Sequence, residues 1–157
     1  DKMELRHATP SDLIRIFEWA NDEEARRNSI NNKQILLEDH IIWYKKKLSD
    51  LNSVLYIFWA ENIPLGSIRF DIDQDEAVLS YSIDKYYRRR GLGFLILKKG
   101  ISALLNEKTK VKVIKGYVHK SNQASNNAFL KIGFKLNLNQ AIKFENFNSY
   151  SLEIKEI

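Results

Sequence analysis

A glycine-containing run with three arginines is the strongest chemical signal in this 157-residue chain. After an alternating, strand-like segment over residues 77–83, the chain reads Tyr87-Arg88-Arg89-Arg90-Gly91-Leu92-Gly93-Phe94. The two glycines permit a tight turn and a close approach of the backbone to a ligand. An apolar run over residues 94–105 predicts a helix, so backbone N–H groups converge at a positive helix N-terminus. This run predicts a pyrophosphate site, although an ordinary strand-to-helix turn with a solvated basic face also fits it.

A second polar group follows further along the chain. It lies on a predicted helix over residues 121–132, directly after a predicted strand over residues 111–118. The group reads Asn122-x-x-Ser125-Asn126-x-x-Phe129-x-x-x-Gly133-Phe134. We expect Gly133 to end the helix as a C-cap, because helices often end on a left-handed glycine. The glycine run at residues 87–94 lacks the Gly-Lys-Ser/Thr of a nucleoside-triphosphate loop and the third glycine of a dinucleotide fingerprint. This run therefore does not identify the phosphate ligand by itself, and the second group is needed to do so.

The elements that position these residues follow from periodicity and turn signals. Cap-type residues at Thr9–Asp12 begin a first helix, and a second over residues 37–48 has Ile41, Ile42, Tyr44 and Leu48 as core positions. A hairpin turns at Glu61-Asn62. Predicted strands cover residues 2–8, 54–60, 63–71, 76–83, 111–118, 134–138, 142–144 and 149–154. This order predicts an α/β or α+β domain with a mixed sheet.

Composition limits the function classes. Hydrophobic residues make up 44% of the chain and only two are proline, which argues for a folded core. Cysteine is absent, which excludes disulfides, thiol catalysis and zinc–thiolate sites, and we expect no metal site. No apolar run approaches the roughly 18 residues that span a bilayer, and no secretory pattern opens the chain, so we expect a cytoplasmic protein without membrane contact. The net charge of +5 favours anionic ligands.

Taken together, the two motifs resemble the GNAT superfamily of N-acetyltransferases. Its acetyl-CoA motif, Arg/Gln-x-x-Gly-x-Gly/Ala, is matched by Arg88, Gly91 and Gly93, and its Asn-started helix ending in Gly-Phe is matched over residues 122–134. The resemblance implies one domain over residues 1–157. It also implies a central mixed, mostly antiparallel sheet of about seven strands with a splayed parallel pair and about four helices. The start at Asp1-Lys2-Met3 fits either a native start at Met3 or a domain cut from a longer, bifunctional protein.

The resemblance also implies an acetyl-CoA site. Backbone N–H groups of the glycine turn would hold the pyrophosphate, and the strand end at residues 81–83 would bond the pantetheine arm through its main chain. The helix beginning at Asn122 would contact the arm or the thioester, although this residue also fits a plain helix N-cap. The residues expected to contact the cofactor are Tyr81, Ser82, Ile83, Arg88, Arg89, Arg90, Gly91, Leu92, Gly93, Phe94, Asn122, Asn126 and Phe129.

Direct acetyl transfer from a thioester to an amine needs an oxyanion donor and a proton for the departing thiolate. The first is expected from a backbone N–H near Ser82. Family members often place a tyrosine acid where this chain has Phe129, which has no proton to give. Ser125 lies one helical turn earlier on the same face and is a candidate donor, although it also fits a plain backbone contact. Candidate bases are His119, Glu76 and His40, and water can replace a base.

The first two helices are expected to build the acceptor pocket. Arginine and aromatic side chains together can hold a phosphate and stack on a base, although an amphipathic helix pair with a polar rim also fits. The expected acceptor residues are Trp19, Asn21, Arg26, Arg27, Asn28, His40, Trp43 and Tyr44. This region resembles acetyltransferases of UDP-linked 4-amino-4,6-dideoxy sugars in bacterial surface-glycan biosynthesis, such as the pseudaminic acid pathway.

Two other interpretations remain open from the sequence. One is a protein N-terminal acetyltransferase of the ribosomal-protein type, whose Asn-x-x-Ser helix also lacks the tyrosine. The other is a non-catalytic acyl-CoA-binding or nucleic-acid-binding module, to which the net charge lends slight support. We expect a small-molecule amine partner and no nucleic acid, because the basic residues gather at the glycine turn. The late strands could support a homodimer.

Overall fold

The chain folds around one mixed sheet in the computed structural model, which describes residues 3–138 and 144–155. The strands are β1 (Glu4–His7), β2 (Ser53–Ala60), β3 (Ile63–Asp73), β4 (Glu76–Ile83), β5 (Val113–His119), β6 (Lys135–Leu136) and β7 (Phe147–Glu153). The α-helices of the described residues are α1 (Leu13–Ala20), α2 (Glu23–Arg27), α3 (Leu37–Ser49), α4 (Leu92–Glu107) and α5 (Gln123–Ile132). In this part of the chain the sheet has seven strands in the order β1-β2-β3-β4-β5-β7-β6. The β4–β5 pair is parallel and the other pairs are antiparallel, which confirms the predicted fold class.

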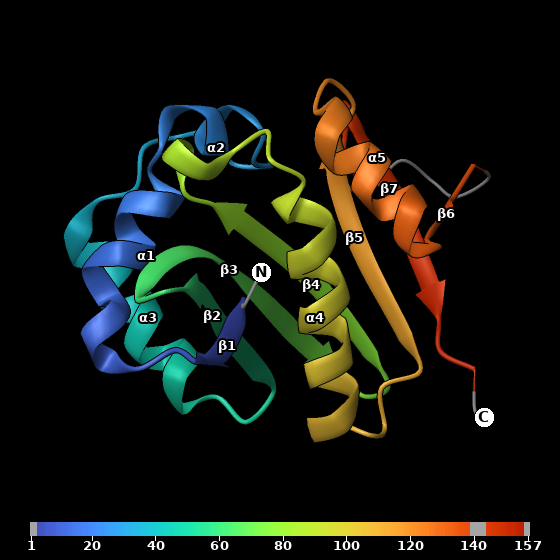
Figure 1. The fold of residues 1–157 in the computed structure, drawn as a ribbon, viewed down its shortest axis with the longest axis horizontal. Coiled ribbons are helices and arrows are strands. Elements are labelled where there is room, and N and C mark those ends of the chain that lie inside the picture. Colours follow the sequence, from blue (N-terminus) through green and yellow to red (C-terminus); the bar gives the residue numbers. More distant parts are fainter. Residues whose placement is uncertain (1–2, 139–143, 156–157) are drawn as a thin grey trace.

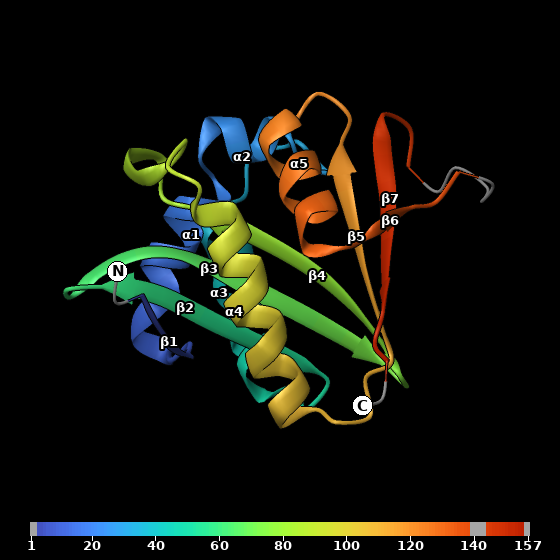
Figure 2. The ribbon, with the colours of Figure 1, turned by 45° about the vertical axis from the view of Figure 1, so that its right-hand side comes forward.

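The helices cover both faces of the sheet (Figures 1 and 2). Successive residues of β2 show the two layers, because side chains of a strand alternate between faces. Tyr56 and Phe58 join the core cluster that contains α4 and α5 residues, whereas Leu55 and Ile57 join the cluster with α1 and α3. The sheet therefore separates an α4–α5 side from an α1–α3 side.

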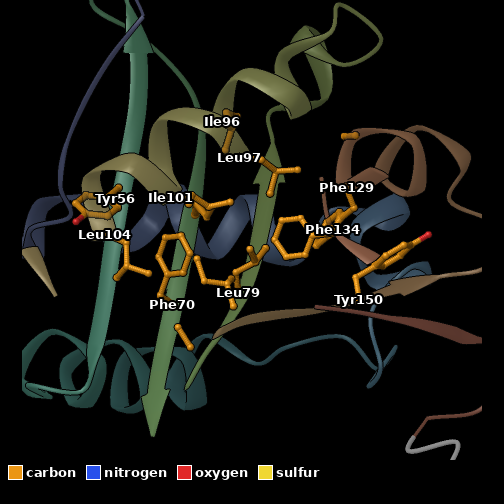
Figure 3. Packing of buried hydrophobic residues seen from close by; sticks show 14 of the residues in the cluster. Tyr56, Phe70, Leu79, Ile96, Leu97, Ile101, Leu104, Phe129, Phe134 and Tyr150 are labelled. Carbon is orange, nitrogen blue, oxygen red and sulfur yellow. The ribbon is translucent and has the colours of Figure 1, made fainter. Parts of the chain in front are cut away.

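The α5 helix lies close against β5 because a glycine faces it. A Cβ on Gly116 would come 2.4 Å from Cε2 of Phe129, so the phenyl ring occupies space that any other residue would fill. Phe129 is buried and packs with Phe134 and Tyr150, at ring-centroid distances of 4.8 and 5.3 Å. Figure 3 shows these three rings pointing toward one another.

Two predictions about core positions and strands need correction. Ile42 on α3 is 70% exposed, and the buried residues of that helix are His40 and Tyr44. Hydrogen bonds explain why these two polar residues can be buried. The Tyr44 hydroxyl donates to the carbonyl of Thr9 at 2.5 Å, and His40 Nε2 lies 2.9 Å from the carbonyl of Leu13. Each of these buried rings therefore has a backbone partner, which hydropathy periodicity does not reveal.

The carboxyl-terminal strands also differ from the expected ranges. The strand expected over residues 134–138 is the short β6, and the last strand begins earlier than expected, at Phe147. The strand expected over residues 142–144 falls partly outside the described residues. None of the helices in the described ranges has the length and apolar character needed to cross a membrane.

Candidate active site

The parallel strands β4 and β5 separate toward their carboxyl ends. Their pairing runs only from Glu76↔Val113 to Leu79↔Gly116, although β4 continues to Ile83 and β5 to His119. Figures 1 and 2 show the two strands diverging beside α4 and α5. Beyond Leu79 the two strands form no ladder with each other, so a ligand can bond the edge of β4 that faces β5.

A cleft of about 790 Å³ lies at this divergence. Small-molecule sites typically measure about 300–1,000 Å³, so the cleft has room for a cofactor arm and an acceptor. Its walls come from β3, β4, β5 and α5, and from α1, α2 and α3 on the other side of the sheet. The cleft therefore connects the two layers through the gap in the sheet.

The glycine turn has the backbone geometry of an anion site. Arg89 has φ 63° and Gly91 has φ 74°, both in the left-handed region. Left-handed residues in a turn bring successive N–H groups to one side and form an anion-binding concavity. Gly91 is the N-cap of α4, whose first N–H groups have no partner within the helix. Apart from its chain neighbours, no residue has an atom within 4 Å of a Cβ placed on Gly91, so this side of the turn is open where the phosphates of acetyl-CoA are expected.

Arg88 lies at the turn but is held by α2. Its guanidinium contacts Asp22 at 2.6 Å and Glu24 at 2.9 Å, with 18% of the side chain exposed. Burial tends to raise the pKa of the Asp22 carboxyl, but hydrogen bonds from Arg88 and from the backbone of Ala25 hold this pKa below its ordinary value. The structure therefore gives Arg88 the role of a link between the glycine turn and α2.

The other residues of the turn point in several directions. Arg89 is mostly exposed and lies 3.4 Å from Glu24, and the Arg90 guanidinium lies over the ring of Tyr87. Phe94 lies outside the cleft, where Lys98 and Lys131 approach its ring. Gly91, Leu92 and Gly93 form the first turn of α4 and its cap. Their N–H groups at the start of α4, rather than the arginine side chains, are the groups expected to face the phosphates.

A hydroxyl pair lies in the cleft where the sequence predicted an acid. Tyr81 on β4 donates to Oγ of Ser125 on α5 at 2.8 Å, and both residues line the cleft. Burial raises the pKa of the Tyr81 phenol, and the Ser125 contact opposes that rise. Phe129 lies beside them, with its ring centroid 6.3 Å from that of Tyr81. The Tyr81 side chain is a part of the site that sequence reasoning missed, because only a main-chain contact was expected from this residue.

The two asparagines of α5 have different surroundings. Asn122 caps the helix by accepting from the Ser125 N–H at 3.2 Å, and it lines the cleft. Asn126 donates to the carbonyls of His119 and Asn122, and its oxygen accepts from Asn148 at 2.9 Å and Tyr150 at 2.5 Å. These four hydrogen bonds tie α5 to β5 and β7, and Asn126 does not line the cleft, so its expected contact with the cofactor stays a prediction.

The three candidate bases are not brought together. Glu76 begins β4 at the end opposite the glycine turn, roughly 20 Å along the strand, and lies 3.4 Å from Lys115. His40 is buried beside α1, where burial lowers its pKa. His119 lines the cleft, but its Nδ1 accepts from the N–H of Ser121 at 3.1 Å. The hydroxyl oxygen of Ser121 lies 2.7 Å from the same nitrogen, so Nδ1 of His119 is already partnered within its own loop.

The acceptor side of the cleft contains several of the expected residues. Trp19, Arg26, Arg27, Asn28 and Trp43 line it, whereas Asn21, His40 and Tyr44 do not. The Arg26 guanidinium donates to the carbonyl oxygens of Ala20, Asn31 and Lys33, and so it orders the loop after α2. Asn21 fixes the same loop through both polar atoms, which bond the backbone of Ile35 at 2.8 Å.

Arg69 on β3 is an acceptor-side residue that the sequence prediction omitted. Its guanidinium lies 5.0 Å from the ring centroid of Trp43 and 2.9 Å from Asp71. In the chain, Ser67, Arg69 and Asp71 alternate with buried apolar residues, and this alternation is the signal that could have found it.

The comparisons with known proteins agree with this architecture. A sequence model of the Acetyltransferase (GNAT) domain matches residues 2–135. Similar solved structures include spermidine N-acetyltransferase from Vibrio cholerae in complex with CoA and spermine, with TM-score 0.86 and 13% identity over 97% of this chain and 95% of that one. An N-acetyltransferase from Staphylococcus aureus Mu50 has TM-score 0.79 and 20% identity, covering 99% and 100%.

A ribosomal L7/L12 alpha-N-protein acetyltransferase in complex with coenzyme A has TM-score 0.79 and 17% identity, covering 97% of this chain and 94% of that one. A comparison with curated protein sequences found no match. The family match spans most of the chain, including the glycine turn, the splayed strands and α5. The chain therefore belongs to the GNAT family of acetyl-CoA-dependent acetyltransferases.

Proposed function

We propose that this acetyltransferase modifies an amine carried on an anionic acceptor, and specifically a UDP-linked 4-amino-4,6-dideoxy sugar of surface-glycan biosynthesis. The observation that carries the proposal is the charge of the cleft. Among the described residues that line it there are five arginines, at positions 26, 27, 69, 88 and 89, and one carboxylate, that of Glu24. Arg27, Arg69 and Arg88 also contact carboxylates that do not line the cleft, so the excess of positive charge is smaller than this count. Glu24 is already engaged by Arg88 and Arg89.

This charge pattern disfavours a polyamine acceptor. A polycationic amine needs unpaired carboxylates, because a cation is bound by opposite charge in a partly desolvated site. Among the described residues that line the cleft, no carboxylate is left for that purpose. The Vibrio cholerae structure contains spermine, so the two proteins are expected to differ in acceptor although their folds agree.

Arg69 and Trp43 support an anionic group on the α1–α3 side. The Arg69 guanidinium forms an ion pair with Asp71 and lies over the ring of Trp43, so its position is fixed before a ligand binds. A fixed guanidinium presents a planar set of donors to phosphate, and this geometry gives affinity at a low ordering cost. A diphosphate beside Arg69 would place the attached sugar toward the gap between β4 and β5.

The catalytic roles follow from the same arrangement. Acetyl-CoA supplies the acetyl thioester when bound. A backbone N–H near Ser82 is the proposed oxyanion donor, because the β4 edge is unpaired with β5 at that point. Ser125 is the proposed proton donor to the thiolate. The amine gives up its proton to water, since Nδ1 of His119 is already partnered by Ser121 and Glu76 lies at the far end of β4.

A thiol-release assay over a panel of amines tests the proposal. The panel contains a UDP-4-amino-4,6-dideoxy sugar, spermidine and an N-terminal peptide of a ribosomal protein. We expect the UDP sugar to be the preferred acceptor. Calorimetry adds a binding measurement: with acetyl-CoA present, absence of UDP binding at millimolar concentration would contradict the proposal.

The panel also tests the runner-up, a ribosomal-protein N-terminal acetyltransferase. The structural likeness to the L7/L12 enzyme and the presence of Ser125 on a helix without the tyrosine favour this second candidate. It predicts acetylation of the peptide α-amine and no response to sugar nucleotides. A protein that binds acetyl-CoA but releases no thiol with any amine would match the non-catalytic alternative.

A further inference from the structure

A tyrosine from the sheet provides a hydroxyl beside the position where the family's α5 tyrosine is missing. Tyr81 and Ile68 are register partners on β4 and β3, and Ile68 belongs to the core cluster that contains α4 and α5 residues. Opposed residues of an antiparallel pair point to the same face, so the Tyr81 ring points to the α4–α5 side. There its hydroxyl donates to Ser125 Oγ.

Gly93 on α4 has no side chain, and this leaves room for the Tyr81 hydroxyl. A Cβ on Gly93 would lie only 3.2 Å from the Tyr81 hydroxyl oxygen. The second glycine of the turn therefore makes room for the phenol, in addition to any role of its backbone. On the other side, the buried Phe129 ring is close to Tyr81 and leaves Ser125 as the nearest polar partner that the structure gives to this hydroxyl.

The direction of the hydrogen bond determines what Ser125 can do. Ser125 is buried, its N–H is used by the Asn122 cap, and its Oγ accepts from Tyr81. A serine hydroxyl has one proton to donate, and in the described part of the chain no acceptor other than the Tyr81 oxygen, which is itself the donor to Ser125, lies within hydrogen-bond distance of it. Because the residue lines the cleft, the remaining donor is available to a ligand there.

We propose that Tyr81 is a positioning residue that orients Ser125 Oγ and resupplies its proton during acetyl transfer. The inference rests on the proposed role of Ser125 and is independent of which amine is the acceptor. Ser125 passes its hydroxyl proton to the sulfur as that atom takes the electron pair of the breaking carbon–sulfur bond. Tyr81 passes its own proton to Ser125 Oγ. The phenolate then regains, through solvent, the proton that the amine lost, so no net charge is left on the protein.

The kinetic test uses a double-mutant cycle. Tyr81→Phe and Ser125→Ala are compared singly and together, with whichever amine gives the highest turnover. We expect each single variant to lower kcat by about tenfold or more with KM for acetyl-CoA within about twofold, and the double variant to match Ser125→Ala. If Tyr81→Phe keeps the wild-type kcat, or if the two losses multiply, the proposal is wrong.

A binding test does not depend on turnover. Calorimetry at pH 8.5 compares CoA with desulfo-CoA, which lacks the sulfur. A donor aimed at the sulfur predicts that the wild type prefers CoA by about fivefold or more, and that Tyr81→Phe and Ser125→Ala lose this preference. Equal preference in the wild type and both variants would overturn the inference even if no acceptor amine is found.

Tyr56→Phe is the matched control for removing a buried tyrosine hydroxyl. Tyr56 is 2% exposed and donates to Glu107 at 2.6 Å, outside the cleft. We expect it to lower the melting temperature without changing kcat or the preference for CoA. If Tyr56→Phe and Tyr81→Phe change kcat alike, the effect of Tyr81 is general destabilisation, which contradicts the proposal.

Discussion

The guanidinium of Arg88 lies 2.6 Å from the carboxylate of Asp22, and this contact joins the glycine turn to the start of α2 beside the cleft. The side chains are 18% and 16% exposed. Because α2 is short and contains no buried residue, the ion pair is a principal tertiary contact of that helix. The pair therefore connects the region expected to bind the donor with the region expected to bind the acceptor.

Asp22→Asn tests the stability of this link as a function of pH. The folded-state pKa of Asp22 is below its ordinary value, so its stabilisation is present above about pH 4 and is lost as pH falls through the folded pKa. We expect the variant to be less stable than the wild type by about 1–2 kcal/mol at neutral pH, with the gap closing toward pH 2. Urea unfolding of the wild type and the variant between pH 2 and pH 7 measures this difference in stability.

Asp75→Asn is the control for Asp22→Asn. Asp75 is an exposed residue of the β3–β4 turn, so this change alters the net charge equally without breaking the Arg88 contact. A stability gap that stays constant for Asp22→Asn down to pH 2 would show that the carboxylate contributes nothing specific.

Gly91→Ala should weaken binding of CoA. The residue has φ 74°, where an L-residue costs roughly 1–2 kcal/mol, and the added methyl group would enter the open side of the anion concavity. We expect the Kd for CoA, measured by calorimetry, to rise by about tenfold or more. Gly133→Ala is the matched control, because φ 117° is also left-handed but the residue ends α5. An equal loss of affinity in both variants would assign the effect to stability alone.

Gly116→Ala should destabilise the protein through overpacking. The new Cβ would lie 2.4 Å from Phe129 Cε2, and an added methyl group in a packed core costs about 1–3 kcal/mol. Thermal unfolding should show a melting temperature lower by several degrees. In a Phe129→Leu background the same change should cost less, because the ring that it strikes is gone. Additive effects of the two changes would contradict this explanation.

Arg69→Ala should weaken binding of the acceptor and leave binding of acetyl-CoA almost unchanged. If the acceptor carries phosphate beside Trp43, KM for the acceptor rises by about tenfold while KM for acetyl-CoA stays within about twofold. Lys47→Met is the control, because Lys47 also contacts Asp71, at 2.7 Å, but does not line the cleft. Steady-state kinetics with both substrates varied gives these constants. An unchanged acceptor KM in Arg69→Ala would remove Arg69 from the proposed pocket.

Local sequence patterns specify the glycine turn, the α5 motif and the order of the helices and strands. These are local properties: Gly91 and Gly133 adopt left-handed conformations that glycine permits, and alternation over residues 76–83 defines a strand. The resemblance to the family rested on these local patterns, and the resemblance implied the mixed fold with one parallel pair. Both are confirmed.

Which polar side chains meet in the cleft depends on tertiary packing. Asn126 and Arg88 match family positions, yet Asn126 makes four hydrogen bonds within the protein and Arg88 forms ion pairs with two carboxylates. The contact of Tyr81 with Ser125 joins residues 44 positions apart, and the position of the phenol depends on Gly93 and Phe129. Sequence spacing does not encode such contacts, because the partners are chosen by how helices pack across the sheet and by which groups burial requires to be paired.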